Sequence, residues 1–414
     1  MLPRPPVAGL LVVLAAVVGL PAAAPAGAAA PRPPSIRAPA AILVEPATGD
    51  IVYSRNADER RPIASTTKLM TALLALERLP LDDVLTAVPY AAAPAESIAG
   101  IRAGERLTVR EYVRALLVQS ANDAAQTLAV RVAGSRKAFV ALMNERARKL
   151  GLHDTHFTTP VGLDVPGNYS TASDLVKLAL LLRANRFARE TVDLRSVTIG
   201  KGSRTRTFPN QNGLVRSVPW VNGVKTGHTR GAGYVLVGSG SRHGVTVLSA
   251  VLGDPSDAAR EQDTLALLRY GTARYHVVHP VTEGRRYAAA PLAYRDEEVR
   301  LVASRTIGRV ARRGEKLSVT VTGTPSEVEG PVPQGTRLGT LVVRQRGKVV
   351  DRVALVTASA VSAASAVQRL EHLAGSPVVL LLLAVFAVGS LGLVLLRRRA
   401  VRRRRGPVGE TETA

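Results

Sequence analysis

A charge-free segment near the C-terminus constrains this chain more than any other feature. Leu373 to Leu396 contains no charged residue. As a helix it would be about 36 Å long at 1.5 Å per residue, which is enough to cross a bilayer. Arginines follow at once, at positions 397–399 and 402–405. Because positive charge marks the cytoplasmic end of a span, we predict a transmembrane helix at 373–396, a cytoplasmic tail at 397–414 and an extracytoplasmic body.

The N-terminal segment agrees with this topology. Arg4 precedes an apolar run, Val7–Leu20, and a stretch of small residues, Pro21–Ala30, follows it. This order is typical of a secretory signal, and the run is shorter than the about 20 residues of a membrane span. We predict a signal peptide at 1–28 and a linker at 29–40. An uncleaved N-terminal anchor is the alternative.

The composition narrows the classes of partner and of chemistry. There are 55 Lys and Arg against 32 Asp and Glu, a net charge of +23. A balance this basic favours a polyanionic neighbour. Aromatic residues are only 4% and no nucleic-acid-binding motif is present, so an anionic membrane face or cell wall fits better than nucleic acid. The absence of cysteine excludes disulfides, thiolate metal sites and cysteine nucleophiles.

The apolar patterning divides the body of the chain into two folded parts. In the first part, residues 41–275, a predicted hairpin is followed by helical segments and then by antiparallel strands and one last helix. This order predicts an α/β (α+β) domain in which both chain ends contribute to one antiparallel sheet beside a helical lobe. Period-two stretches rich in Val, Thr, Arg and Gly predict a small all-β domain at 276–358. An Ala- and Ser-rich linker, 359–372, leads to the C-terminal helix.

The first chemical motif is Ser65-Thr66-Thr67-Lys68, at the start of a predicted helix over 65–79. Residues three apart share a helix face, so the lysine amine lies beside the serine hydroxyl. A hydroxyl needs an adjacent base to act as a nucleophile, and a lysine whose pKa is lowered by burial is such a base. Backbone N–H groups of the first turn also suit an oxyanion. Alone, the motif is weak, and an N-cap serine followed by an exposed lysine is then the favoured interpretation.

Two further motifs follow in order. Ser120-Ala121-Asn122 lies between two predicted helices and offers a hydroxyl and an amide, although a helix cap would look the same. Lys225-Thr226-Gly227 lies on a predicted strand, where an exposed edge would pair with an extended peptide. Gly227 would let a ligand approach the backbone closely, although a strand ending in a turn also fits. The three motifs together are far more specific than any one of them.

The ordered set Ser-x-x-Lys, Ser-x-Asn, Lys-Thr-Gly resembles the signature of penicillin-binding proteins and serine β-lactamases. The chain is most similar to the D-alanyl-D-alanine carboxypeptidases, the low-molecular-mass penicillin-binding proteins, from about Ala41 to Tyr270. The stretches that carry this resemblance include the sequences at 45–49, 56–58, 64–71, 120–124, 162–164, 169–172 and 221–229. The family implies a catalytic domain, a following β-rich domain and C-terminal membrane attachment. Many relatives attach to the membrane by an amphipathic helix, whereas the C-terminal helix of this chain is predicted to span the membrane.

The resemblance also implies roles for individual residues. Ser65 corresponds to the nucleophile and Lys68 to its general base. Ser120 and Lys225 correspond to the pair that relays a proton and stabilises charge. The remaining implied positions are Asn122 for the substrate amide, the backbone N–H groups of Ser65 and His228 for the oxyanion, and Thr226 and Arg260 for the terminal carboxylate, with Gly227 beside them. The local sequence around Arg260 is loose, and a surface arginine is the alternative there.

The resemblance implies a serine carboxypeptidase that removes the terminal D-alanine from peptidoglycan stem peptides through an acyl-Ser65 intermediate, binds β-lactams and needs no metal or other cofactor. One departure is Val161, where relatives often carry histidine before Gly-Leu-Asp. A β-lactamase is disfavoured because no Glu-x-x-Leu-Asn stretch lies between Asn122 and Lys225. A D,D-endopeptidase, a transpeptidase and a non-catalytic wall-binding scaffold remain alternatives, and the scaffold would not need Ser65 and Lys68.

Overall fold

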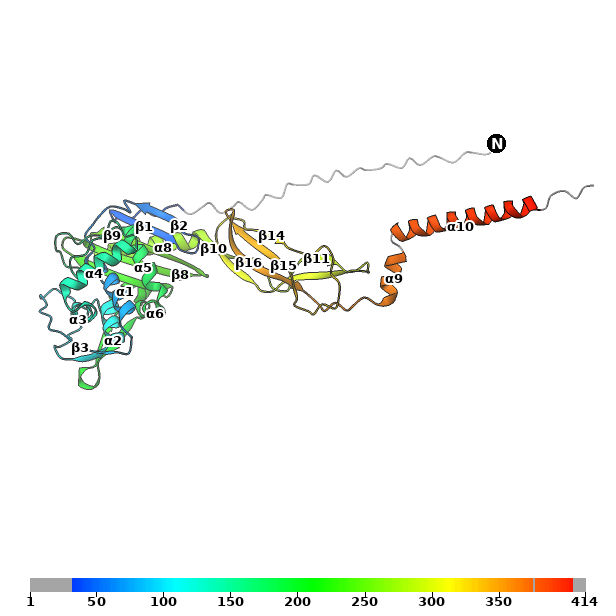
Figure 1. Cartoon of the computed structure of the whole chain (residues 1–414). Coiled ribbons are helices and arrows are strands. Elements are labelled where there is room, and N and C mark those ends of the chain that lie inside the picture. Colours follow the sequence, from blue (N-terminus) through cyan, green and yellow to red (C-terminus); the bar gives the residue numbers. More distant parts are fainter. Residues whose placement is uncertain (1–31, 375–376, 405–414) are drawn as a thin grey trace, which may run out of the picture.

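The computed structural model describes residues 32–374 and 377–404. The predicted signal peptide at 1–28 and the last part of the predicted tail, 405–414, lie outside the described residues. Figure 1 shows a domain of mixed helices and strands, then a β domain beside it, and then two helices toward the C-terminus. This order agrees with the fold class that the sequence predicts.

The catalytic-type domain is built on a five-stranded antiparallel sheet whose strand order is β2-β1-β9-β8-β7. The N-terminal hairpin supplies β1 (Ala40–Glu45) and β2 (Asp50–Arg55). The C-terminal strands are β7 (Val221–Thr229), β8 (Gly233–Arg242) and β9 (Val245–Asp254). Since β1 pairs with β9, the sheet is assembled from segments about two hundred residues apart, as the apolar patterning predicts.

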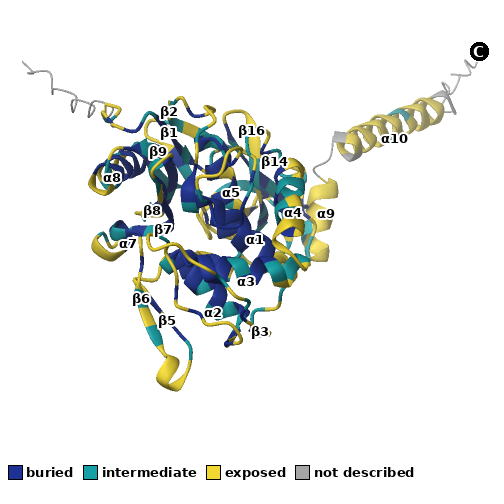
Figure 2. Ribbon diagram, turned by 90° about the vertical axis from the view of Figure 1, so that its left-hand side faces the viewer, coloured by how far each residue is buried: buried dark blue, intermediate teal, exposed yellow. Residues whose placement is uncertain are grey.

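Helices cover both faces of this sheet and form the lobe beside it. Helix α8 (Asp257–Arg274) packs against β8 and β9, while α5 (Ala172–Ala184) packs against β9 and β1 on the side of α1. The lobe's helical elements are η1 (Ala64–Thr67), α1 (Lys68–Arg78), α2 (Val109–Arg114), η2 (Ala115–Gln119), α3 (Asn122–Ala133), α4 (Arg136–Lys149), α6 (Arg186–Val192) and α7 (Gly213–Ser217). Figure 2 shows α1 and α3 largely buried, and the buried residues are those of their N-terminal parts, which follow the first two motifs.

Two of the predicted helices are interrupted in an informative way. The predicted 65–79 helix starts as a 3₁₀ turn, η1, before α1 begins at Lys68. The predicted helix before Ser120 begins as α2 and becomes a π-helical segment, η2, which ends at the second motif. Such departures from α geometry are common at functional sites. Two small hairpins of the lobe were not predicted, β3 (Val84–Thr86) with β4 (Arg106–Thr108) and β5 (Ser196–Ile199) with β6 (Arg206–Pro209).

The β domain contains two sheets around its own apolar core. One sheet has the order β11-β12-β16-β15-β14, and the other pairs β10 with β13. The strands are β10 (Tyr275–Val281), β11 (Arg286–Pro291), β12 (Glu298–Ala303), β13 (Ile307–Arg312), β14 (Ser318–Thr322), β15 (Arg337–Gln345) and β16 (Lys348–Thr357). Leu301, Leu341 and Leu355 are fully buried in this core. Alternate residues of β12 are buried, as expected for a strand with one face on a core.

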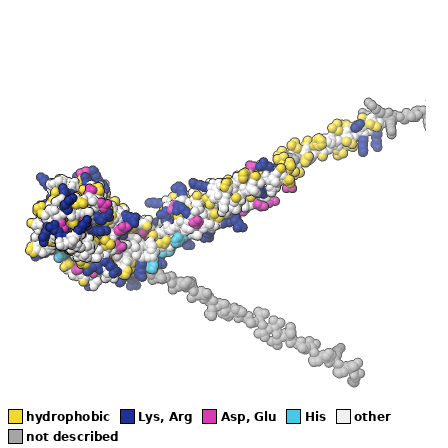
Figure 3. All heavy atoms as spheres, turned by 90° about the horizontal axis from the view of Figure 1, so that it is seen from below, with side chains coloured by type: hydrophobic (Ala, Val, Ile, Leu, Met, Phe, Trp, Pro, Cys, Tyr) yellow, Lys and Arg dark blue, Asp and Glu magenta, His cyan; other side chains and the backbone are white. Residues whose placement is uncertain are grey.

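The C-terminal segment is helical over more of its length than the sequence predicts. Helix α9 (Ala366–Ala374) lies largely within the predicted 359–372 linker, because its alanines and leucines favour helix. Helix α10 (Pro377–Arg404) continues through the arginines. Its segment Leu380–Arg402 is long and apolar enough to cross a membrane, with a mean hydropathy of 2.4, and none of its most apolar stretch is buried. Figure 3 shows hydrophobic side chains covering this helix, with cationic ones at its far end.

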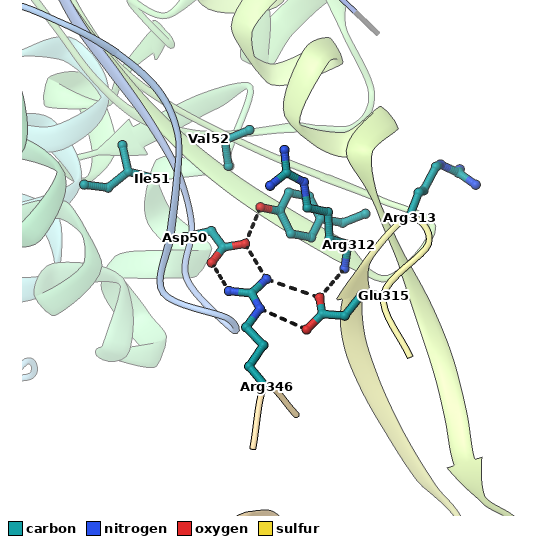
Figure 4. A pocket seen from close by; sticks show the side chains of 8 residues that line it. Asp50, Ile51, Val52, Arg312, Arg313, Glu315 and Arg346 are labelled. Atoms are coloured by element: carbon teal, nitrogen blue, oxygen red, sulfur yellow. Dashed lines mark hydrogen bonds and ion pairs between the residues drawn. The ribbon is translucent and has the colours of Figure 1, made fainter. Parts of the chain in front are cut away.

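A charged cluster joins the catalytic-type domain to the β domain (Figure 4). Arg346, in the turn between β15 and β16, contacts Asp50 of the N-terminal hairpin, with 2.8 Å between Nη2 and Oδ2. Its Nε lies 2.9 Å from Oε1 of Glu315, and the Tyr275 hydroxyl donates to Asp50 over 2.7 Å. The cluster borders a cavity of about 360 Å³. One arginine thus bridges two carboxylates from different domains.

Candidate active site

Ser65 and Lys68 meet at the junction of η1 and α1. Lys68 Nζ lies 2.8 Å from Ser65 Oγ and 2.7 Å from the carbonyl oxygen of Val161. The lysine side chain is completely buried, which is rare for lysine. Because the Val161 contact uses a backbone carbonyl, valine in place of the family's histidine leaves this contact unaffected.

Burial changes the acid–base chemistry of Lys68. Desolvation lowers the pKa of its ammonium from 10.5 to about 7, although the negative charges of Glu96 and Asp123 act in the opposite direction. A large fraction of the amine is therefore neutral at neutral pH. Its nitrogen is within hydrogen-bond distance of the serine hydroxyl, so it is able to accept that proton.

Backbone strain accompanies both serines of the first two motifs. Ala64, directly before Ser65, has φ 47°, and Ser120 has φ 67° and ψ 29°. This left-handed region costs a non-glycine residue of order 1–2 kcal/mol. Ser120 ends the π-helical segment η2, and its side chain is buried. Its Oγ has no hydrogen-bond partner among the described residues, as expected of a hydroxyl that waits for a substrate or a transferred proton.

Two glycines allow a close approach to the backbone around Ser65. A Cβ on Gly227 would lie 3.0 Å from the Ile63 carbonyl oxygen and 3.1 Å from the backbone nitrogen of Ser65. A Cβ on Gly162 (φ 84°) would lie 2.0 Å from the Ala64 carbonyl oxygen. The third motif therefore needs glycine at position 227 for close approach of β7 to η1, rather than for a turn.

Two basic side chains, Lys225 and Arg260, are buried at β7. Lys225 is buried, and its Nζ donates to the Thr226 carbonyl oxygen over 3.0 Å. Desolvation, together with the charges of Lys68 and Arg260, holds the pKa of Lys225 well below its usual value. Arg260 is only 6% exposed, so it is not a surface arginine. Its Nη1 donates to the Gly227 carbonyl oxygen over 3.0 Å, and the guanidinium pairs with Asp257.

The remaining site positions lie on β7 and at the start of α3. Thr226 is nearly buried, and the exposed His228 stacks its ring on Tyr234 with 4.0 Å between centroids. Asn122 is 4% exposed, and its Nδ2 donates to Oε2 of Glu96 over 2.7 Å. Since β7 packs against both η1 and η2, the structure brings the three motifs to one place.

Sequence reasoning did not identify Glu96. It lies in an irregular loop and matches no motif, and its contact with Asn122 joins residues 26 positions apart. The only available signal was an acidic residue in an otherwise apolar and small-residue stretch, Ala91–Ala99. Among the residues that the structure describes, no group of three or more His, Asp or Glu side chains is arranged to hold a metal ion.

A buried lysine amine on a serine hydroxyl, beside a sheet strand with a second buried lysine, is the arrangement of serine enzymes that work through an acyl intermediate. Residues 27–256 match the family model of the D-alanyl-D-alanine carboxypeptidases. The chain is 32% identical over 367 residues to the D-alanyl-D-alanine carboxypeptidase DacD of Escherichia coli, covering 82% of this chain and 91% of the relative. The chain therefore belongs to the D-alanyl-D-alanine carboxypeptidase family and is a serine peptidase.

Two solved structures place this likeness in three dimensions. Penicillin binding protein 5 from Haemophilus influenzae is 28% identical, with a TM-score of 0.58, over 80% of this chain and 99% of the other. The DD-transpeptidase of Streptomyces K15 is 36% identical, with a TM-score of 0.56, over 58% of this chain and 99% of the other. The match to penicillin binding protein 5 is longer than the catalytic-type domain of this chain. The match to the Streptomyces K15 protein is about as long as that domain alone.

Proposed function

We propose that this chain is a membrane-anchored carboxypeptidase that removes the terminal D-alanine from peptidoglycan stem peptides, with Ser65 as nucleophile and Lys68 as general base. The observation that carries the proposal is the 2.8 Å contact between Lys68 Nζ and Ser65 Oγ, made by a buried amine whose pKa is about 7. A solvated lysine would be protonated at neutral pH and unable to accept the serine proton.

The reaction proceeds in two halves. The neutral Lys68 amine takes the hydroxyl proton while Ser65 Oγ bonds to the carbonyl carbon between the last two D-alanines. Backbone N–H groups of Ser65 and His228 stabilise the oxyanion. Collapse breaks the C–N bond and releases D-alanine, whose nitrogen receives a proton relayed through Ser120 and Lys68. Water then adds to the acyl-Ser65 ester, and its breakdown frees the shortened peptide and restores the hydroxyl.

The free carboxylate of the substrate matches the positive charge behind β7. Arg260 supplies a cation, and Lys225 and Thr226 supply an amine and a hydroxyl, at the strand that would pair with an extended peptide. Asn122 offers its carboxamide to a substrate amide. β-Lactams carry a comparable carboxylate and a reactive amide, so we propose that they acylate Ser65 as well.

The test uses the full-length protein in detergent. Incubation with a pentapeptide that ends in D-Ala-D-Ala, followed by mass analysis, should show loss of one alanine. Ser65→Ala and Lys68→Ala should each lower the rate by several orders of magnitude. Fluorescent penicillin should label the wild type and not Ser65→Ala. If the intact protein neither cleaves the peptide nor takes the label, the wall-binding scaffold is the better description.

Transpeptidation is the second candidate, because the similar Streptomyces K15 protein is named a DD-transpeptidase. The same acyl-Ser65 would then pass to an amine instead of water. Adding an amino acceptor to the pentapeptide assay measures the partition directly. Predominant hydrolysis supports the carboxypeptidase. Transfer that exceeds hydrolysis at low acceptor concentration supports the transpeptidase, and rapid hydrolysis of penicillin would indicate a β-lactamase.

We further propose the topology and the domain division. The exposed apolar surface of α10 and the arginines at its end support a single span with the catalytic domain outside and the C-terminus in the cytoplasm. The proposed domains are 41–275 and 276–358. Protease added to wall-stripped intact cells should digest both domains and spare a tag placed after Ala414. Cleavage of that tag while the membrane is sealed would contradict the orientation.

A further inference from the structure

The loop between β3 and β4 is fastened to the start of α3 by hydrogen bonds at the last residue of the second motif and at the residue after it. The Asn122 backbone N–H donates to the Ser97 carbonyl oxygen over 2.8 Å. The Asp123 carboxylate accepts from the backbone N–H groups of Ala99 and Ile101, at 3.1 and 2.9 Å. These contacts hold Glu96 at a fixed place beside the Asn122 side chain.

The Glu96 carboxylate accepts hydrogen bonds from three donors. Its Oε2 accepts from Asn122 Nδ2 over 2.7 Å and from the Tyr90 hydroxyl, and its Oε1 accepts from the Ala93 backbone N–H over 3.2 Å. Burial raises the pKa of Glu96, but the hydrogen bonds from Tyr90 and Asn122 outweigh it and leave the pKa below its usual value. Glu96 is therefore ionised at neutral pH.

An ionised carboxylate accepts hydrogen bonds and donates none. Only the NH₂ end of the Asn122 carboxamide is able to face it, which fixes how the amide is turned. The opposite end, Oδ1, is then directed away from Glu96. It is buried and has no hydrogen-bond partner among the described residues. A buried acceptor without a partner is costly, and a donor from a bound ligand removes that cost.

We infer that Glu96, assisted by Tyr90, is a positioning residue for the active site, which turns Asn122 so that its carbonyl oxygen is presented to a substrate N–H. This inference rests on the proposed function of Ser65 and Lys68. Glu96 acts through Asn122 and through its charge, and it does not itself contact the reacting atoms.

The same carboxylate has a second effect on the site. Three charged groups act on the buried Lys68–Lys225 pair: Glu96 and Asp123 raise the pKa of Lys68, and Arg260 lowers the pKa of Lys225. The charge of Lys68 also lowers the pKa of Lys225. Removal of the Glu96 charge alone should therefore lower the pH at which Lys68 becomes neutral, without any change in the hydrogen bonds of Lys68.

Three variants separate these effects. Glu96→Ala removes both the acceptor and the charge. Glu96→Gln keeps an acceptor for Asn122 Nδ2 and removes the charge. The matched control is Glu77→Gln, which removes a carboxylate from α1 that pairs with Arg146 rather than with Asn122. Thermal melting of each full-length variant establishes that it is folded. If Glu96→Ala does not fold, Tyr90→Phe replaces it, since it removes one donor from the same carboxylate.

The readouts are the rates of acylation by benzylpenicillin and of deacylation, each followed from pH 5 to 9. A lost hydrogen bond to a charged group corresponds to about tenfold to a hundredfold, so Glu96→Ala should acylate more slowly by that factor. Tyr90→Phe should slow acylation in the same direction by less. Glu96→Gln should recover most of the rate at its optimum, with its acidic limb moved to lower pH. Glu77→Gln should match the wild type.

Each other outcome overturns the inference. An acylation rate and a pH profile unchanged in Glu96→Ala would show that Asn122 needs no positioning. A Glu96→Gln rate as low as that of Glu96→Ala would show that hydrogen bonding to Asn122 is not what matters. Normal acylation with an acyl-enzyme that persists would make Glu96 a base for deacylation. Absence of acylation in the wild type itself would instead refute the proposed function.

Discussion

The pH dependence of acylation is the sharpest test of the Lys68 assignment. Acylation needs the neutral amine, so its rate should follow the deprotonated fraction of Lys68. With a pKa of about 7 rather than 10.5, half of the amine is neutral at pH 7 instead of about one part in three thousand. The rate should therefore reach a plateau above about pH 8 and fall roughly thirtyfold below that plateau at pH 5.5.

The sign follows from the direction of the shift. Burial disfavours the ammonium, so protons leave Lys68 at lower pH than they leave a solvated lysine. The measurement is stopped-flow acylation of full-length protein by a fluorescent penicillin between pH 5 and 9. Two controls identify the titrating group. Asp254→Asn removes a remote carboxyl whose pKa is also about 7, and His228→Gln removes the nearby imidazole while keeping its backbone N–H.

Both controls should keep the midpoint near pH 7. A midpoint near 10 would mean that Lys68 is solvated in the working enzyme, and a rate independent of pH would mean that another group accepts the proton. A midpoint that disappears in His228→Gln would assign the proton transfer to the imidazole. Any of these results refutes the argument from burial.

Three further predictions concern charges elsewhere in the structure. Arg260→Ala should lower kcat/KM for a free-acid peptide by about tenfold to a hundredfold more than for its C-terminal amide, because a charge-assisted contact is lost; equal losses would make its role structural. Arg346→Ala should lower the free energy of unfolding by about 1 kcal/mol near neutral pH, measured by denaturant titration. Since Arg346 holds the pKa of Asp50 at about 2, this deficit should shrink as pH falls from 4 toward 2. Burial and the charge of Asp263 raise the pKa of Asp254 to about 7. The folded state therefore disfavours the ionised carboxylate, and the free energy of unfolding should decline as pH rises from 4 through 7. Asp254→Asn should accordingly raise Tm more at pH 8 than at pH 5.

Much of the architecture is readable from local patterns. The hairpin at 41–54, the short apolar runs of β8 and β9 and the helical spacing of leucines after Lys68 each predict an element that the structure contains. The segments that escaped prediction have weaker signals. Strand β10 contains a proline and β11 ends in one, and α9 lies largely within an alanine- and serine-rich segment that predicts a linker.

The contacts of the candidate site also fall into those that local spacing predicts and those that depend on tertiary packing. Ser65 and Lys68 are three residues apart, so local helical geometry alone predicts their contact. The partner of Asn122 is a glutamate in an irregular loop, and no periodicity predicts which loop residue will face it. The burial of Arg260 likewise depends on how α8 packs against the sheet. Tertiary contacts of this kind cannot be derived from spacing along one element.

The fit of Gly227 against Ile63 and Ser65 has a consequence for inhibitor resistance. Because Gly227 has no side chain, β7 lies directly against the backbone of Ile63 and Ser65, so neither segment is free to shift without the other. A variant that excludes penicillin by moving β7 would also displace Ser65 from its own substrate. We therefore expect tolerated resistance substitutions to arise around the rim of the site, where an inhibitor and a stem peptide differ in shape, and not at position 227.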